Sequence, residues 1–178
     1  MINIKVFKLI GEEDIKEKVK ELADRISKDY CNKDLVLIGV LKGAFVFLAD
    51  LIRNLTIPCC CDFIKVSSYG QGTETSGVVK IVADISTPIE NKDVLLVEDI
   101  VDTGLTLKYL IDHLSLKKPK SLKICALLDK PEKHRLKISI DYLGFTIPNK
   151  FVVGYGIDYD EKFRYLPYIG YIELNEKE

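Results

Sequence analysis

The most informative stretch of the sequence is VLLVEDIVDTGLT, at residues 94–106. The four aliphatic residues at 94–97 predict a short buried strand, and residues 105–116 predict a helix. The turn between them is rich in acidic, hydroxyl and glycine residues. In an open α/β sheet, ligands bind beyond the carboxyl ends of the strands. This turn is therefore the first place to expect a functional site.

The turn offers groups that suit a phosphate monoester. Thr103, Gly104 and Thr106 provide backbone N–H groups, hydroxyls and the amino end of a helix, which together favour an anion. Glu98 and Asp99 come just before them, in a position to accept hydrogen bonds from sugar hydroxyls. Aspartate and threonine are also common helix caps. However, three acids beside an anion site, Glu98, Asp99 and Asp102, exceed what capping needs. We therefore predict a site for a sugar phosphate.

The rest of the chain alternates strands and helices. Apolar periodicity predicts helices over residues 12–30 and 44–54, and apolar runs predict strands over residues 35–41, 58–66, 78–85 and 122–128. Residues from Pro131 onward contain short aromatic and aliphatic segments and are expected to be β-rich with loops. The pattern predicts an α/β fold with a mainly parallel twisted sheet flanked by helices.

Composition excludes several classes of protein. The 178 residues suit a single domain, and the net charge of −1 provides no basic field for nucleic acid or anionic lipid. No apolar run approaches the roughly 18 residues that span a bilayer. We expect a cytoplasmic protein. The three consecutive cysteines, Cys59, Cys60 and Cys61, are expected to be small buried hydrophobes rather than disulfide partners or zinc ligands.

The sequence lacks two common nucleotide-binding motifs. The sequence GYG at residues 154–156 begins a dinucleotide fingerprint, but the third glycine is missing and no long helix follows. A GxxxxGK[ST] motif is also absent. We therefore expect neither NAD binding nor P-loop chemistry.

Residues 94–106 closely resemble the phosphoribosyl-pyrophosphate motif of type I phosphoribosyltransferases. Nearly the whole chain resembles the hypoxanthine-guanine phosphoribosyltransferases of bacterial length. The other matching segments are GVLKGA at 39–44, SSYG at 67–70, LLDKP at 127–131, KFVVGYGIDYDEKFR at 150–164 and LPYIG at 166–170. The resemblance implies one phosphoribosyltransferase domain over residues 1–178, with a small β-rich hood formed by terminal segments.

The resemblance implies an enzyme of purine salvage. In the implied reaction, a purine nitrogen displaces pyrophosphate from carbon 1 of phosphoribosyl pyrophosphate, and hypoxanthine or guanine gives IMP or GMP. The implied phosphoribosyl-pyrophosphate site consists of Lys42, Gly43, Glu98, Asp99, Asp102, Thr103, Gly104, Leu105, Thr106 and Arg164. A cis peptide bond is implied before Lys42. Some relatives have lysine where this chain has Leu105, but a loop that binds phosphate through backbone N–H groups should tolerate the change.

The resemblance also implies Mg²⁺ as the cofactor. Magnesium ions would bridge the pyrophosphate and the ribose hydroxyls near Glu98 and Asp99, and Asp158 would be a protein ligand of a second ion. Few protein ligands are expected, because Mg²⁺ keeps several waters and binds substrate phosphates.

The implied purine site contains Lys130, Phe151, Val152 and Asp158. Lys130 would donate to the 6-oxo oxygen, Phe151 would stack on the base, and the main chain near Val152 would bond its Watson–Crick edge. Such a site rejects adenine, because a buried ammonium would then face an amino group. Asp102 is expected to be the catalytic group, as the proton acceptor for N7 of the purine.

Residues 67–77, SSYGQGTETSG, form a polar, glycine-rich stretch between two expected strands. We expect a flexible loop that closes over the site, with Ser68 and Tyr69 reaching the reacting centre. An oxocarbenium-like centre is open to attack by water, so the site must be closed during the reaction.

Two other functions remain open from the sequence. The first is a transferase that also accepts xanthine, and the second is a regulatory protein that senses phosphoribosyl pyrophosphate. A regulator of that kind that binds nucleic acid needs a basic face or an added domain. We expect phosphoribosyl pyrophosphate and 6-oxopurines as partners, neither nucleic acid nor membrane, and a homodimer or homotetramer.

Overall fold

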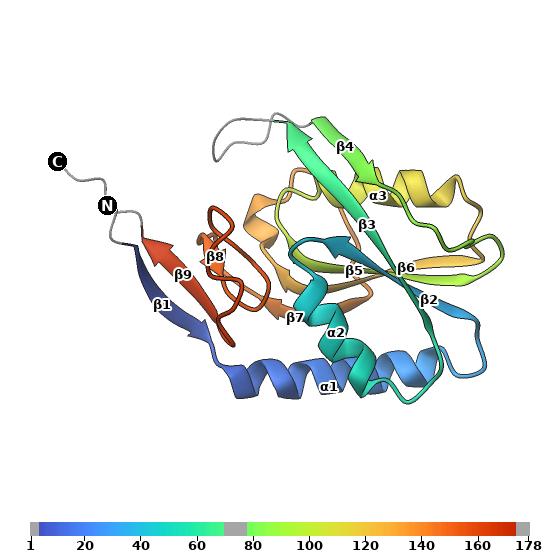
Figure 1. Cartoon of the computed structure of the whole chain (residues 1–178), viewed down its shortest axis with the longest axis horizontal. Coiled ribbons are helices and arrows are strands. Elements are labelled where there is room, and N and C mark those ends of the chain that lie inside the picture. Colours follow the sequence, from blue (N-terminus) through green and yellow to red (C-terminus); the bar gives the residue numbers. More distant parts are fainter. Residues whose placement is uncertain (1–3, 70–77, 174–178) are drawn as a thin grey trace.

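The computed structural model describes residues 4–69 and 78–173 (Figure 1). Its main sheet contains β2 (Leu35–Leu41), β3 (Cys60–Tyr69), β4 (Val78–Ala83), β5 (Asp93–Val101), β6 (Ser121–Asp129) and β7 (Tyr142–Thr146). The strand order is β4-β3-β2-β5-β6-β7, and all neighbours are parallel except β3 and β4. The predicted mainly parallel sheet is therefore confirmed.

Three α-helices cover the two faces of this sheet in the described part of the chain. They are α1 (Glu12–Asp29), α2 (Phe45–Asn54) and α3 (Leu105–Ser115). The first two pack on one face and α3 on the other (Figure 1). Strand β2 serves both faces, because Leu35 and Leu37 join the core under α1 and α2 while Val36 and Ile38 join the core under α3. Burial on both faces explains the uninterrupted apolar run of this strand.

The terminal segments form a second, antiparallel sheet, which we call the hood. It contains β1 (Lys5–Ile10), β9 (Ile169–Glu173) and β8 (Val152–Val153), in the order β1-β9-β8. Strand β1 was not expected from the sequence. Its pairing with β9 includes a stacked contact between Phe7 and Tyr171, with ring centroids 5.2 Å apart. The hood itself was predicted, and it is confirmed.

Two strands continue well beyond their expected carboxyl ends. Strand β5 continues to Val101, so Glu98 and Asp99 belong to the strand rather than to the turn after it. Strand β3 continues to Tyr69, because Ser67, Ser68 and Tyr69 pair with β4. The expected loop at 67–77 thus begins as strand, and its residues 70–77 lie outside the described residues.

The expectation that the consecutive cysteines are buried is wrong. Cys60 and Cys61 are exposed and Cys59 is partly exposed, whereas Cys125 in β6 is buried. The reason lies in the sheet, since β4 pairs with β3 only from Lys65 onward. The first half of β3 is therefore at the edge of the sheet.

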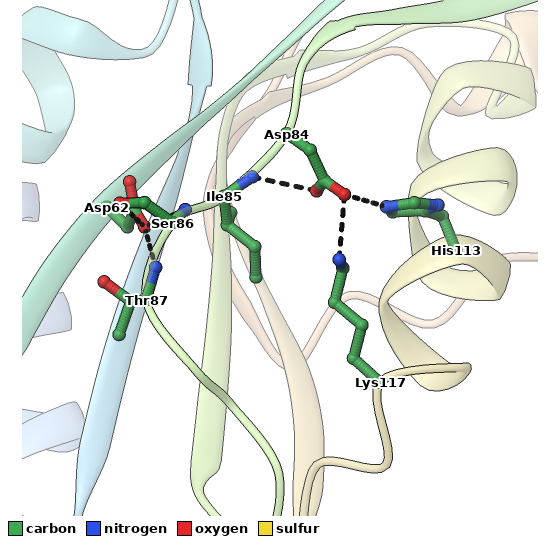
Figure 2. Close-up of polar contacts among 7 residues, drawn as sticks. All are labelled: Asp62, Asp84, Ile85, Ser86, Thr87, His113 and Lys117. Carbon is green, nitrogen blue, oxygen red and sulfur yellow. Dashed lines mark hydrogen bonds and ion pairs between the residues drawn. The ribbon is translucent and has the colours of Figure 1, made fainter.

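The segment between β4 and β5 is fastened by two aspartates (Figure 2). Asp62 of β3 accepts hydrogen bonds from the N–H groups of Ser86 (2.8 Å) and Thr87 (2.7 Å). Asp84 accepts from Lys117 Nζ (2.8 Å), and its Oδ2 lies 3.0 Å from His113 Nε2. These contacts hold the segment against both β3 and the end of α3.

Among the described residues, no helix is both long enough and apolar enough to cross a bilayer.

Candidate active site

The carboxyl ends of β2, β5 and β6 bring the expected site residues to one edge of the main sheet. Strand β2 ends at Leu41, and the peptide bond between Leu41 and Lys42 is cis. Gly43 follows, and a Cβ atom at this position would lie 1.8 Å from Asp99 Oδ2. Glycine therefore lets the loop after β2 approach the acidic end of β5.

Glu98 and Asp99 form an acidic pair at the end of β5, in which Glu98 is buried and Asp99 is partly buried. Glu98 is only 7% exposed, and its Oε2 has no hydrogen-bond partner among the described residues. Burial, followed by the neighbouring charge of Asp99, raises the pKa of Glu98 well above its ordinary value. Burial also raises the pKa of Asp99 to about 6, although backbone hydrogen bonds and then the charge of Arg164 oppose this shift. The unpartnered oxygen of Glu98 is thus available for a partner from outside the chain.

The phosphate turn, residues 102–106, joins β5 to α3. Gly104 has a φ of +82°, and a Cβ there would lie 2.3 Å from Ile138 Cδ1. Both the backbone conformation and the lack of space therefore favour glycine at this position. Helix α3 begins at Leu105, directly after this glycine. The first N–H groups of a helix lack helical partners and attract anions. This geometry suits the binding of a phosphate.

Asp102 lies between two lysines. Its Oδ2 is 3.9 Å from Lys130 Nζ, and its Oδ1 is 3.8 Å from Lys133 Nζ. The Oδ1 atom is buried and has no hydrogen-bond partner among the described residues. Lys130 is 6% exposed. Burial lowers the pKa of Lys130, while the charge of Asp102 opposes this shift. The group combines a proton acceptor with a buried cation.

These side chains open into a cavity of about 270 Å³, which we call the Lys130 cavity. Its lining residues are Ile100, Asp102, Lys130, Lys133, Asn149, Lys150, Phe151, Val152, Ile157 and Asp158. Phe151 is 41% exposed and meets Tyr159 edge to face, with centroids 5.4 Å apart. The cavity thus offers an aromatic ring and convergent polar groups, which is the usual composition of a small-molecule site.

Asp158 and Arg164 form an ion pair on the side of the site near Lys42. Arg164 Nη2 lies 2.7 Å from Asp158 Oδ1, and Arg164 Nη1 donates to the carbonyl oxygen of Gly156 (2.7 Å). Lys42 Nζ lies 2.8 Å from Glu161 Oε1. Lys42 and Arg164 therefore place two cations beside the acidic end of β5. Within residues 4–69 and 78–173, no group of three or more His, Cys, Asp or Glu side chains is arranged to hold a metal ion.

The structure gathers the expected residues of β2, β5, β6 and the 150–164 segment at this site. Ser68 and Tyr69 lie in β3, which runs parallel to β2 and continues beyond Leu41, the partner of Lys65. Their predicted closure over the site lies outside what the described residues test.

Four further residues at the site were not expected from the sequence: Lys133, Asn149, Lys150 and Glu161. Lys133 had a detectable signal: it follows Lys130 by three residues across the 3₁₀ turn Pro131–Lys133, and residues three apart share a side of such a turn. Glu161 had none, because its partner Lys42 is 119 residues away.

Comparison with known proteins gives a family. The model of the phosphoribosyl transferase domain matches residues 11–160. The hypoxanthine-guanine phosphoribosyltransferase of Bacillus subtilis is 49% identical over 165 residues, which cover 93% of this chain and 92% of that protein. The bifunctional protein TilS/HprT of Listeria monocytogenes is 47% identical over 93% of this chain, but the chain spans only 26% of that relative.

The fold has solved counterparts as well. A crystal structure of a hypoxanthine-guanine phosphoribosyltransferase from Bacillus anthracis, with a HEPES molecule in its active site, has a TM-score of 0.89 and 50% identity. The match covers 96% of this chain and 99% of that one. The α/β sheet, the hood and these similarities all indicate the same family. The chain belongs to the phosphoribosyltransferase family and, within it, to the hypoxanthine-guanine phosphoribosyltransferases.

Proposed function

We propose that this protein transfers the 5-phosphoribosyl group from phosphoribosyl pyrophosphate to hypoxanthine and guanine, releasing pyrophosphate. One observation carries the proposal: the buried Lys130 and the acid Asp102 face the same cavity as Phe151, and the phosphate turn adjoins them. A 6-oxopurine needs a donor for its oxygen, an acceptor for a proton and a surface for its ring. The cavity contains all three.

The sugar half of the substrate is assigned to the end of β5. The phosphate turn would bind the 5'-phosphate through its backbone N–H groups, and Leu105 is compatible with that role because the side chain is not used. Glu98 and Asp99 would accept hydrogen bonds from the ribose hydroxyls. Their charge, placed beside carbon 1, would stabilise the positive charge that develops on the ribose ring.

Lys42 and Arg164 are assigned to the pyrophosphate. A guanidinium can bind two phosphate oxygens at once, and an ammonium adds a point charge. Backbone N–H groups near Gly43 would also bind the pyrophosphate. Because Gly43 has no side chain, this loop can approach Asp99 closely.

Mg²⁺ fits the acidic residues of this site. The unpartnered Oε2 of Glu98 is a buried acceptor, and Asp158 presents its carboxylate beside Arg164. Asp158 would hold one ion directly, whereas Glu98 and Asp99 would help to hold a second ion together with the ribose hydroxyls. When bound, Mg²⁺ neutralises charge on the leaving pyrophosphate.

The proton and the base specificity are assigned to two residues. Asp102 would accept the proton from N7 of the purine, and Lys130 would donate to the 6-oxo oxygen. Phe151 would stack on the ring, and the main chain at Val152 would contact the Watson–Crick edge. Adenine would leave the buried ammonium of Lys130 facing another donor, which is strongly unfavourable.

Two alternatives differ in what they need. A xanthine-accepting transferase would use the same side chains and differ only at position 2 of the base. A sensor that binds nucleic acid needs a basic surface, which a net charge of −1 does not favour. Hence the transferase is the better proposal. We also propose a cytoplasmic location and assembly as a homodimer or homotetramer.

Nucleotide formation tests the proposal. Purified protein is mixed with phosphoribosyl pyrophosphate, Mg²⁺ and each of hypoxanthine, guanine, xanthine and adenine, and the nucleotides are separated by chromatography. We expect IMP and GMP but no AMP, and no product when Mg²⁺ is chelated. Formation of XMP at a comparable rate would support the xanthine alternative. No nucleotide from any base would overturn the transferase assignment.

A further inference from the structure

Glu161 connects the two cations that we assign to the pyrophosphate. Its Oε1 lies 2.8 Å from Lys42 Nζ, and its Oε2 lies 3.1 Å from Arg164 Nη2. The side chain of Glu161 is 65% exposed, so nothing in the core requires an acid here. Both cations lower the pKa of Glu161, which is therefore ionised. A carboxylate thus uses the same donors that a phosphate group would use.

The two cations depend on Glu161 to different degrees. Arg164 is 19% exposed and also contacts Asp158 and the carbonyl oxygen of Gly156, so two acceptors hold it without Glu161. By contrast, the exposed ammonium of Lys42 is held, among the described residues, by its salt bridge with Glu161. Glu161 itself is presented from a tight turn, in which its N–H donates to Asp158 Oδ2 (2.9 Å) and its φ is +59°. The carboxylate can therefore leave the cations while its backbone stays in place.

We propose that Glu161 competes with pyrophosphate for Lys42 and Arg164, and so weakens the binding of pyrophosphate and speeds its release. The inference rests on the proposed function, which assigns these cations to pyrophosphate. An incoming phosphate must displace the carboxylate, because both are anions that accept from the same N–H groups. Exposed ion pairs are weak, so the displacement costs little. The carboxylate returns to the cations when pyrophosphate leaves.

The change Glu161→Gln tests the inference, with Asp160→Asn as the matched control. Asp160 is the neighbouring residue, has a similar φ of +52°, and pairs with Lys162 at 3.0 Å instead of with Lys42 or Arg164. Both changes remove one negative charge from the same turn. Pyrophosphate is titrated into each protein by isothermal calorimetry at a fixed Mg²⁺ concentration. The inhibition constant of pyrophosphate against phosphoribosyl pyrophosphate is measured in parallel.

We expect Glu161→Gln to bind pyrophosphate about 3- to 10-fold more tightly than the unchanged protein, a size set by the loss of the two ion pairs that the exposed Glu161 carboxylate makes. Asp160→Asn should change the affinity by less than about twofold. The inhibition constant should fall by the same factor as the dissociation constant.

Equal tightening in both variants would overturn the inference, since it would reflect net charge alone. Weaker binding in Glu161→Gln would also overturn it, because Glu161 would then be orienting the cations for pyrophosphate. Failure of the proposed function looks different. In that case the unchanged protein would bind pyrophosphate no better than a Lys42→Ala, Arg164→Ala double variant, and the inference would be overturned along with the assignment of the cations.

Discussion

Two groups of acidic residues in this protein behave in opposite ways. Asp62 and Asp84, which hold the segment between β4 and β5 in place (Figure 2), have their oxygens occupied by N–H and ammonium donors. Burial acts to raise their pKa values, but hydrogen bonds outweigh it, so the pKa of Asp62 falls to about 2 and that of Asp84 is also lowered. Glu98 and Asp99, at the end of β5, have raised pKa values instead.

The difference separates structural acids from functional ones. Buried polar groups in proteins are nearly always paired, and an unpaired oxygen such as Glu98 Oε2 costs free energy. Such a cost persists where a ligand will supply the missing partner. The aspartates of Figure 2 stabilise the chain, whereas we propose that the acids of β5 and the phosphate turn are prepared for a substrate. Four predictions test this contrast.

The largest effect is expected at Asp102. Asp102→Asn keeps the shape of the side chain but removes the proton acceptor, so kcat should fall by about 10²- to 10⁴-fold while KM for phosphoribosyl pyrophosphate stays nearly constant. Steady-state kinetics with hypoxanthine measure both constants. The control Asp112→Asn changes an exposed aspartate of α3 that pairs with Lys108, and it should leave kcat unchanged. Near-normal turnover of Asp102→Asn would remove Asp102 from the role of base.

The second effect is expected at Lys130. Lys130→Ala removes a buried charged donor, so KM for hypoxanthine should rise by about 10- to 100-fold, as for a lost hydrogen bond to a charged group. KM for phosphoribosyl pyrophosphate should change far less. The control Lys137→Ala removes an exposed lysine from the segment that follows. Equal increases in both KM values would mean that Lys130 has a structural role or binds phosphoribosyl pyrophosphate rather than the purine.

The features of the site that depend on a local sequence pattern can be predicted from the sequence. The aliphatic run at 94–97 and the acidic turn after it identify the end of a buried strand, so the position of Asp102, Gly104 and Thr106 near a ligand can be predicted. The turn Pro131–Lys133 likewise follows a predictable strand. Periodicity and strand order are sufficient for this level of detail.

Other features depend on contacts between distant segments, which no local pattern reports. The pairing of β1 with β9 joins the two ends of the chain, and the Lys42–Glu161 contact spans 119 residues. The burial of Glu98 was also unexpected, because an acid normally ends a buried run rather than continuing the strand. The exposure of Cys60 follows from where β4 begins to pair, which only the assembled sheet determines.

The third effect concerns stability rather than activity. Asp62→Ala removes the acceptor for Ser86 and Thr87, so the free energy of unfolding should fall by about 1–3 kcal/mol while kcat stays close to normal. The folded pKa is lowered, so the contribution of Asp62 is present above its unfolded pKa of about 3.8 and is lost as pH falls toward about 2. Urea unfolding at several pH values measures the difference. Asp24→Ala, which removes an exposed pair with Lys20, is the control. A deficit in Asp62→Ala that is equally large near pH 2 would contradict the role of its charge.

The smallest effect has the opposite sign and is expected at Glu98. Its raised folded pKa means that the folded protein holds a proton more tightly than the unfolded chain, so the charged carboxylate destabilises the fold as pH rises above about 4. Glu98→Gln removes this charge and should raise Tm by about 2–4 °C at pH 8, the shift that about 1 kcal/mol produces in a chain of this size.

The gain from Glu98→Gln should shrink toward pH 4, where the unchanged protein also becomes neutral at this position. Scanning calorimetry at pH 4, 6 and 8 measures it, with the exposed Glu17→Gln as the control. Affinity for phosphoribosyl pyrophosphate should fall in the same variant, because the ribose hydroxyls lose a charged acceptor. A lower Tm at pH 8 would mean that Glu98 stabilises the fold as Asp62 does, and the contrast between the two groups of acids would then fail at its most buried member.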